Sequence, residues 1–229
     1  MRLSLIRALL IIASALTLPA TAHAQMALNK VVVDFSNPAS RRDDIKITNS
    51  GNDTLFVLVE PFQIIEPGTK AQKRVKVRDP GKFGLLVTPN RFVLKPKQSK
   101  IMRIVVLKPA EKRDRIYRLT VKPVIGQVEA AQTAVKIVFG YDVLVVVRPN
   151  GGKPELQAKR EGKSLTFTNT GTTSALLSNG KQCDKAGENC VDSPPKRIYV
   201  GNTWTTELKY DTPVEYYVTV GTVIKQERF

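Results

Sequence analysis

The stretch TAVKIVFGYDVLVVV, residues 133–147, decides the fold of this chain. Successive side chains of an extended chain point to opposite faces, so Val135, Ile137 and Phe139 share one face while a lysine lies on the other. From Val143 onward both faces are apolar, which is typical of a strand buried on both sides. The stretch therefore predicts one long strand, the first half of which carries its apolar face beyond its own core.

An apolar face that extends past the core has two interpretations. Soluble proteins usually suppress such exposed strand segments because they promote aggregation. The segment is then either the central strand of a sandwich, fully covered by its own domain, or an edge that a partner covers. Composition alone favours the central strand, and the residues by themselves leave both interpretations open.

The rest of the first half of the chain has the periodicity of short strands. Turn-forming residues separate the apolar segments, with clear turns at 49–53 and 79–82. Many short strands at regular spacing favour an all-β sandwich over a fold of alternating strands and helices. The predicted strands lie at 28–35, around 45–47, at 55–65, around 75–77, and at 85–88, 92–94, 99–107, 115–124 and 133–147.

A break in the pattern at Arg148-Pro-Asn-Gly-Gly152 predicts a domain boundary. The charge balance changes at the same place: residues 25–149 hold 23 basic and 11 acidic residues, whereas residues 150–229 hold 11 and 9. A chain of this length suits two small domains. We expect domains at 25–149 and 150–229, the second with six strands at 156–159, 164–169, 175–178, 198–200, 204–209 and 216–220, and a turn at Asn179-Gly180.

The first 24 residues have the features of a cleavable secretory signal peptide. Two arginines precede an apolar run at 8–18, and Ala22-His23-Ala24 provides a small-residue cleavage site before Gln25. The apolar run is much shorter than the roughly 20 residues that cross a bilayer. We therefore expect an exported mature chain that begins at Gln25.

Export to an oxidising compartment favours a disulfide between the two cysteines, Cys183 and Cys190. Closing so short a loop stabilises the fold by ~2.5 kcal/mol on the loop-entropy model. The disulfide is therefore a local cross-link and not the framework of the whole fold. A redox site or a metal site would need a different spacing or more ligands.

The only histidine, His23, lies in the signal peptide. Without histidine the mature chain has no Ser-His-Asp or Cys-His arrangement and no imidazole metal ligand. Carboxylate pairs and Ser-Lys dyads need no imidazole, but no motif isolates one. We expect no enzyme activity, no cofactor and no metal.

The formal net charge of +16 raises the question of nucleic-acid binding. Nucleic-acid binders interleave basic residues with exposed aromatic residues or present a recognition helix, and this sequence shows neither pattern. A basic surface equally attracts an acidic protein partner or the surface of a membrane. We therefore expect no nucleic-acid partner and peripheral membrane contact at most.

Several segments together resemble the periplasmic pilus chaperones of the chaperone–usher pathway, and the likeness spans the mature chain. They are VTPNRFVLKPKQSKIMRIVV at 87–106, YRLTVKPV at 117–124, VKIVFGYDVLVVVRP at 135–149, LTFTNTGTTSALL at 165–177 and CDKAGENC at 183–190. The Tyr-Arg pair and the two cysteines are most similar to the alternate class of these chaperones.

The resemblance implies two immunoglobulin-like β-sandwich domains in a boomerang arrangement. It also implies a periplasmic protein that completes a pilus subunit with one of its own strands and delivers it to an outer-membrane usher. This mode is donor-strand complementation. By position, Val135, Ile137 and Phe139 would enter pockets of the subunit, with Thr133 at the start of the series. Self-association of the free chaperone through the same strand is left open.

Members of the family anchor the subunit's terminal carboxylate with two basic residues, and this sequence departs from that pattern. Val32 and Leu144 occupy the two positions. Arg118 is the first alternative, followed by Arg103 and Lys30, because each lies among apolar strand residues, where a charge needs a reason. The alternative interpretation is that each of the three is a charged residue at a strand edge whose side chain reaches solvent. This alternative is the favoured one for Lys30.

Two other classes of protein remain as alternatives. A secreted immunoglobulin-like adhesin or structural pilus component would share the fold and the signal peptide but would not need an uncovered apolar strand. A periplasmic carbohydrate-active enzyme would need two carboxylates roughly 5 to 10 Å apart in a cleft.

Overall fold

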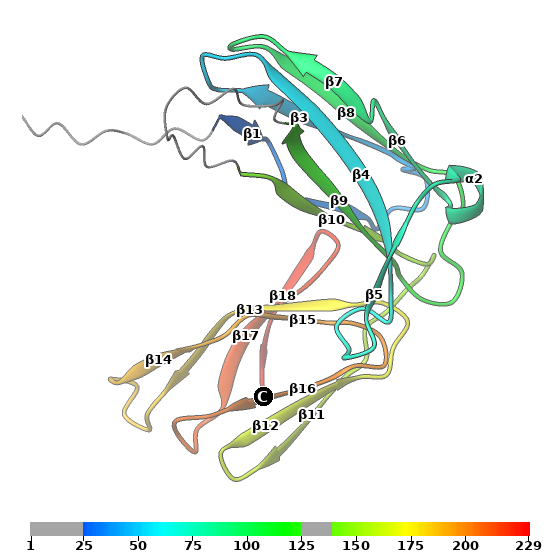
Figure 1. Cartoon of the computed structure of the whole chain (residues 1–229). Coiled ribbons are helices and arrows are strands. Elements are labelled where there is room, and N and C mark those ends of the chain that lie inside the picture. Colours follow the sequence, from blue (N-terminus) through cyan, green and yellow to red (C-terminus); the bar gives the residue numbers. More distant parts are fainter. Residues whose placement is uncertain (1–24, 125–138) are drawn as a thin grey trace, which may run out of the picture.

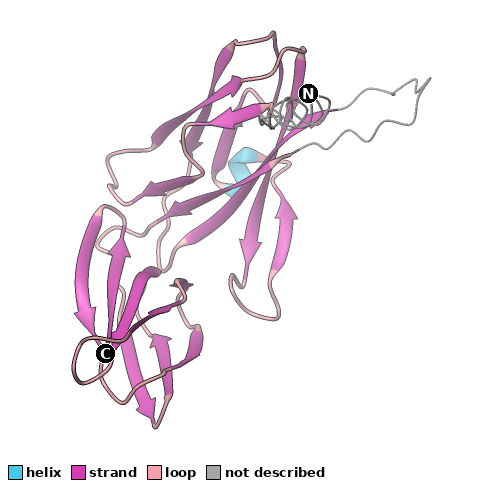
Figure 2. Ribbon diagram, turned by 90° about the vertical axis from the view of Figure 1, so that its left-hand side faces the viewer, coloured by secondary structure: helices cyan, strands magenta, loops and turns pink. Residues whose placement is uncertain are grey.

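The chain forms two immunoglobulin-like β-sandwich domains in a boomerang arrangement, seen in a computed structural model that describes residues 25–124 and 139–229 (Figure 1). The view turned by 90° shows strands throughout, with a single short helix among the described residues (Figure 2). The predicted signal peptide and most of the predicted donor strand lie outside the described residues. None of the described helices is long and apolar enough to cross a membrane.

The first sandwich consists of two sheets. Every strand pair in it is antiparallel except β2 with β10, which is parallel. One sheet has the order β1 (Met26–Leu28), β3 (Arg42–Asn49), β8 (Ser99–Val106), β6 (Leu85–Thr88). The other has the order β2 (Val32–Phe35), β10 (Tyr141–Val147), β9 (Arg115–Val124), β4 (Leu55–Ile65), β5 (Lys73–Lys76), and β7 (Arg91–Leu94) also pairs with β4.

The prediction of a single strand at 28–35 was wrong, because the chain changes sheets there. β1 pairs with β3 in one sheet, whereas β2 pairs with β10 in the other. Asn29 lies at the crossing and holds β3 through a hydrogen bond from the Lys46 backbone N–H to its side chain. Both short strands send apolar side chains into one core. The apolar pattern of the sequence therefore runs on without interruption, although the strand ends and a new one begins.

The core of the first sandwich lies between its sheets and contains the inward-facing residues of both, including Ile45, Met102, Leu119 and Val145. Residues Val143–Val147 are all buried, which confirms the prediction for the second half of the decisive segment. The segment predicted as a turn at 79–82 instead forms one helical turn, α2 (Pro80–Phe83), which begins at the capping side chain of Asp79.

The second sandwich has eight strands, not the six predicted. A three-stranded sheet contains β11 (Leu156–Glu161), β12 (Ser164–Asn169) and β16 (Thr203–Glu207). The other sheet has the order β14 (Cys190–Ser193), β13 (Ala175–Cys183), β17 (Val214–Val220), β18 (Val223–Arg228), and β15 (Lys196–Ile198) also pairs with β13. Aromatic rings fill its centre, where Phe167 contacts Trp204, Tyr216 and Phe229.

The prediction of a turn at Asn179-Gly180 was also wrong, because these residues lie inside β13. The pairing of β13 with β17 shifts between Ser178 and Lys181, so the two residues form a bulge in a continuous strand. Gly180 is required there, since a Cβ would come within 2.4 Å of the Tyr216 ring. The strands β14 and β18 were missed because their side chains are mostly polar and exposed.

Candidate functional site

The strand β10 has one edge that is only partly covered. It pairs with β9 along its whole length, but with β2 only from Leu144, which faces Val32. Among the described residues, no strand covers the β2-side edge between Tyr141 and Val143. Unpaired N–H and C=O groups on such an edge are a template for another strand.

Exposed apolar side chains flank this open edge. Phe139, two residues before β10, is 68% exposed, and Val31 and Val32 are about half exposed where β2 begins. Thr133, Val135 and Ile137 lie outside the described residues, so their role in binding a partner stays a prediction. The described part of the site therefore combines an open strand edge with apolar side chains at both of its ends.

The outward face of the same sheet carries basic residues arranged around Asp142. Arg74 donates two hydrogen bonds to the Asp142 carboxylate, at 2.8 and 3.2 Å, and one to the hydroxyl of Thr120. Arg118 donates to the backbone carbonyl of Asp142 and lies 3.8 Å from its carboxylate. Arg118, on β9, thus lies across β10 from the open edge, and it shares one aspartate with a second arginine.

A second carboxylate on this face, Glu60, accepts hydrogen bonds from two lysines. The Nζ atoms of Lys76 and Lys122 lie 2.5 and 2.7 Å from its two oxygens, and these bonds lower the pKa of Glu60 to about 2. Four cations surround two carboxylates in this region, which we call the basic belt; its cations are Arg74, Lys76, Arg118 and Lys122. Its positive charge would attract an acidic partner to the open edge.

The other two candidate anchors lie away from the basic belt. Arg103 is on the opposite sheet, where its Nε and Nη2 atoms each donate to Asp44 at 2.9 Å. Lys30 lies between β1 and β2 and pairs with Asp43 at 2.5 Å. The structure therefore does not bring Arg118, Arg103 and Lys30 together, and two of them already hold a carboxylate of their own.

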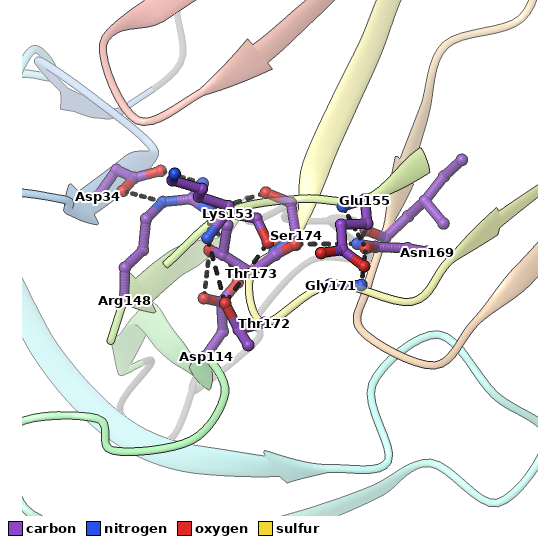
Figure 3. Close-up of polar contacts among 11 residues, drawn as sticks. Asp34, Asp114, Arg148, Lys153, Glu155, Asn169, Gly171, Thr172, Thr173 and Ser174 are labelled. Carbon is purple, nitrogen blue, oxygen red and sulfur yellow. Dashed lines mark hydrogen bonds and ion pairs between the residues drawn. The ribbon is translucent and has the colours of Figure 1, made fainter. Parts of the chain in front are cut away.

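A buried polar network joins the two sandwiches, and Arg148 is its centre (Figure 3). Its guanidinium donates two hydrogen bonds of 2.8 Å to Asp34 of the first sandwich. It also donates to the hydroxyl of Thr173 and, at 2.8 Å, to the carbonyl of Ser174, both in the second sandwich. Asp114 accepts from the Thr173 hydroxyl and the Ser174 N–H, so one carboxylate from the first sandwich also binds the second.

Apolar and backbone contacts complete the junction. Tyr199 of the second sandwich packs against a cluster from the first that contains Ile64, Ile116, Leu144 and Val146. Asn202 donates to the carbonyl of Pro67, in the connection between β4 and β5, at 2.7 Å. Sequence reasoning missed the junction residues; the one available signal was the Arg-Pro pair that directly follows a buried strand.

Two further features of the described residues bear on function. Cys183 and Cys190 form the predicted disulfide, which joins the paired strands β13 and β14. Phe56, Val93 and Val124 are cross-strand neighbours and each is about half exposed. Adjacent exposed apolar side chains of this kind are typical of a surface that contacts other proteins.

Comparisons with known proteins agree with this architecture. A family model described as "Pili and flagellar-assembly chaperone, PapD N-terminal domain" matches residues 25–153. A CS1 fimbrial protein of Escherichia coli is 26% identical over 204 residues, which span 84% of each chain. A CFA/I fimbrial protein of the same organism is 25% identical and spans 88% of this chain and 85% of its own.

Solved structures show the same fold at low sequence identity. A chain from the complex of the Salmonella enterica SafA pilin with the SafB chaperone superimposes with a TM-score of 0.64 at 15% identity, covering 92% of this chain and 99% of its own. The class 5 fimbriae chaperone CfaA superimposes with a TM-score of 0.62 at 18% identity, covering 89% and 98%.

Proposed function

The chain belongs to the family of pilus and flagellar-assembly chaperones, and on that premise we propose that it binds pilus subunits by strand addition in the periplasm and delivers them to an outer-membrane usher. The predicted signal peptide supports export, and the likeness to the CFA/I relative is consistent with the alternate class. Relatives whose structures are solved include a chaperone in complex with a pilin, which supports a pilin as the partner.

The open edge of β10 is the observation that carries this proposal. A subunit strand laid along Phe139 to Val143 would find unpaired backbone groups, and it would meet β2 at Val32. In an extended chain, alternation backward from Phe139 would put Ile137 and Val135 on the same face as Phe139. The apolar half-strand is therefore interpreted as the surface that completes a pilus subunit.

Strand addition needs no chemical energy source. Each main-chain hydrogen bond contributes about 0.5 to 1.5 kcal/mol net, and each buried apolar side chain contributes about 1.5 to 3 kcal/mol. Three such side chains with several hydrogen bonds hold a pilin that cannot close its own core. A strand with a better fit to the pilin can still displace this one, which allows delivery.

Co-purification from the native host tests the proposal. The tagged mature chain should retain a stoichiometric pilus subunit, and Ile137→Asp should abolish the capture because a carboxylate would enter an apolar pocket. Lys136→Asp is the matched control, since it places the same group one residue away on the opposite face. Equal capture by both variants would support the alternative, a secreted adhesin or structural component without chaperone activity.

A further inference from the structure

Two glycines, one from each sandwich, contact the other sandwich at the junction. Gly221 begins the two-residue turn between β17 and β18, and Gly68 lies in the connection between β4 and β5. Both have a positive φ, +59° and +78° respectively. Figure 1 shows the β17–β18 hairpin reaching the first sandwich beside β10, and the β4–β5 connection reaching the second sandwich. Each glycine therefore lies at the tip of a hairpin that crosses the junction.

Neither glycine has room for a side chain. A Cβ at Gly221 would lie 2.5 Å from the Cβ of Ser36, the residue that follows β2. A Cβ at Gly68 would lie 2.5 Å from the amide nitrogen of Asn202 and 2.9 Å from the ring of Tyr199. Ordinary contacts of a Cβ begin at 3.4 Å, so a side chain at either position would push the two sandwiches apart.

The surrounding contacts prevent a purely local adjustment. The hairpin of Gly221 is held by six residue pairs between β17 and β18, and the Cβ of Ser36 is fixed to the backbone at the end of β2. On the other side, the Asn202 amide donates to the carbonyl of Pro67 at 2.7 Å, and the Tyr199 ring packs against the apolar cluster of the first sandwich. Close-packed elements transmit strain, so an added Cβ would move one sandwich relative to the other.

The two glycine contacts lie at opposite edges of one sheet. Its order is β2, β10, β9, β4, β5, and Ser36 extends β2 whereas Gly68 connects β4 to β5. Between the edges, Arg148 and Tyr199 join the sandwiches near the middle of the sheet. Neighbouring strands are about 4.8 Å apart, so five strands span roughly 19 Å. The second sandwich is thus bound at the centre and rests on a glycine contact at each edge.

The contact of Gly221 lies on the edge that is open to a partner. β2 covers the four residues of β10 that follow the open part, and Ser36 comes next, about 13 Å along the same edge. Val223 and Ile224 follow the turn of Gly221 and are 56% and 62% exposed. A folded domain of about 100 residues has a radius of gyration of about 13 Å. A subunit held at the open edge would therefore reach this hairpin.

We propose that Gly221 and Gly68 are positioning residues that set the tilt between the two sandwiches and thereby determine how a bound subunit meets the second sandwich. The second part rests on the proposed function. A Cβ at Gly221 would widen the junction at the β2 edge by about 1 Å, which over the sheet corresponds to a tilt of about 3°. A Cβ at Gly68 would widen it at the opposite edge, so the tilt would have the opposite sense.

Residual dipolar couplings of the free mature chain measure this tilt, because they report the orientation of each sandwich separately. Gly221→Ala and Gly68→Ala should each rotate the second sandwich by about 3°, in opposite senses. The double variant should return most of the way to the orientation of wild type, because the junction is then widened at both edges. Rotations in the same sense, or no rotation, would overturn the proposal.

Matched glycines control for the strain of an alanine at positive φ. Gly162 has the same φ as Gly221, +59°, and Gly187 at +77° matches Gly68. Within residues 25–124 and 139–229, a Cβ at either control position would meet no atom within 4 Å. Gly162→Ala and Gly187→Ala should lower the melting temperature through backbone strain but leave the orientation unchanged. A rotation in these controls equal to that of Gly221→Ala would show that contact at the junction is not the cause.

Subunit retention tests the functional part. The subunit that co-purifies with the tagged chain is challenged with an excess of untagged wild-type chain, and its transfer is followed over time. Gly221→Ala should speed the transfer about threefold or more, because the tilt displaces Val223 and Ile224 from the subunit. Gly162→Ala should transfer the subunit at the wild-type rate.

The outcomes distinguish the two proposals. If the wild-type chain captures its subunit and Gly221→Ala rotates the sandwich without changing the transfer rate, the tilt does not govern binding and this inference fails, while strand addition stands. If the wild-type chain captures no subunit, the proposed function fails, and the role of the two glycines in subunit binding fails with it.

Discussion

Two arginine–aspartate pairs in the first sandwich have the same geometry in different surroundings. Arg148 donates from Nε and Nη2 to Asp34 at 2.8 Å, and Arg103 donates from the same two atoms to Asp44 at 2.9 Å. The Arg148 side chain is 4% exposed, whereas that of Arg103 is 43% exposed. Distances alone would rank the two pairs as equal, and burial separates them.

The difference in burial decides what the loss of each arginine costs. At the junction Arg148 also holds Thr173 and Ser174, so its removal would leave Asp34 and Asp114 buried with one cation fewer. A buried charge that loses its partner is strongly destabilising. On the open sheet surface water replaces the lost hydrogen bonds, so an exposed pair contributes little.

Arg148→Ala should have the largest effect on stability. We expect it to lower the free energy of unfolding by about 3 to 5 kcal/mol, because the buried Asp114 and the largely buried Asp34 lose their main cation. Equilibrium urea unfolding measures the change. Arg148→Lys should recover only part of it, since an ammonium cannot form the paired hydrogen bonds of the guanidinium. A loss no larger than that of an exposed pair would show that the network does not hold the sandwiches together.

The contrast also explains what could be predicted from sequence. Strand composition was sufficient for the all-β fold and for the buried run Val143–Val147, because β-branched residues without polar neighbours fit only a covered strand. The change of sheet between β1 and β2 could not be predicted, since both strands point apolar residues into one core.

The candidate anchors show the limit of sequence for the site. Arg103 was selected because its neighbours in the strand are apolar, but only the register of β3 with β8 reveals that Asp44 lies opposite it. Tyr199, which packs against the first sandwich, lies in the segment PPKRIYV, which gave no signal of a domain contact. Its position depends on how two domains meet, and local pattern contains no information about that contact.

The exposure of the Glu60 side chain lies between those of Arg148 and Arg103, and its ion pairs predict how stability depends on pH. Its side chain is 17% exposed, and its pKa falls from the ordinary 4.5 to about 2 through hydrogen bonds from Lys122 and Lys76. A folded-state pKa below the unfolded value means that the carboxylate stabilises the fold above about pH 4.5 and loses this effect as the pH falls toward 2.

Glu60→Gln should therefore lower the melting temperature at neutral pH and approach wild type in acid. Thermal unfolding followed by circular dichroism from about pH 6 to about pH 2 measures the convergence. Glu66→Gln is the control, because that carboxylate is about half exposed and, within the part of the chain that the structure describes, its ion pair is with Arg113 at 3.6 Å. A constant difference between Glu60→Gln and wild type across this range would contradict the assigned partners.

Arg103→Ala should have the smallest effect, although its two hydrogen bonds to Asp44 match those of Arg148 in length. Arg103 lowers the pKa of Asp44, but both side chains are at least a third exposed, so water and salt screen their attraction. We expect the melting temperature to change by less than about 3 °C, and the change to shrink further in about 1 M salt. A shift as large as that of Arg148→Ala would mean that the paired geometry, and not burial, sets the strength of these ion pairs.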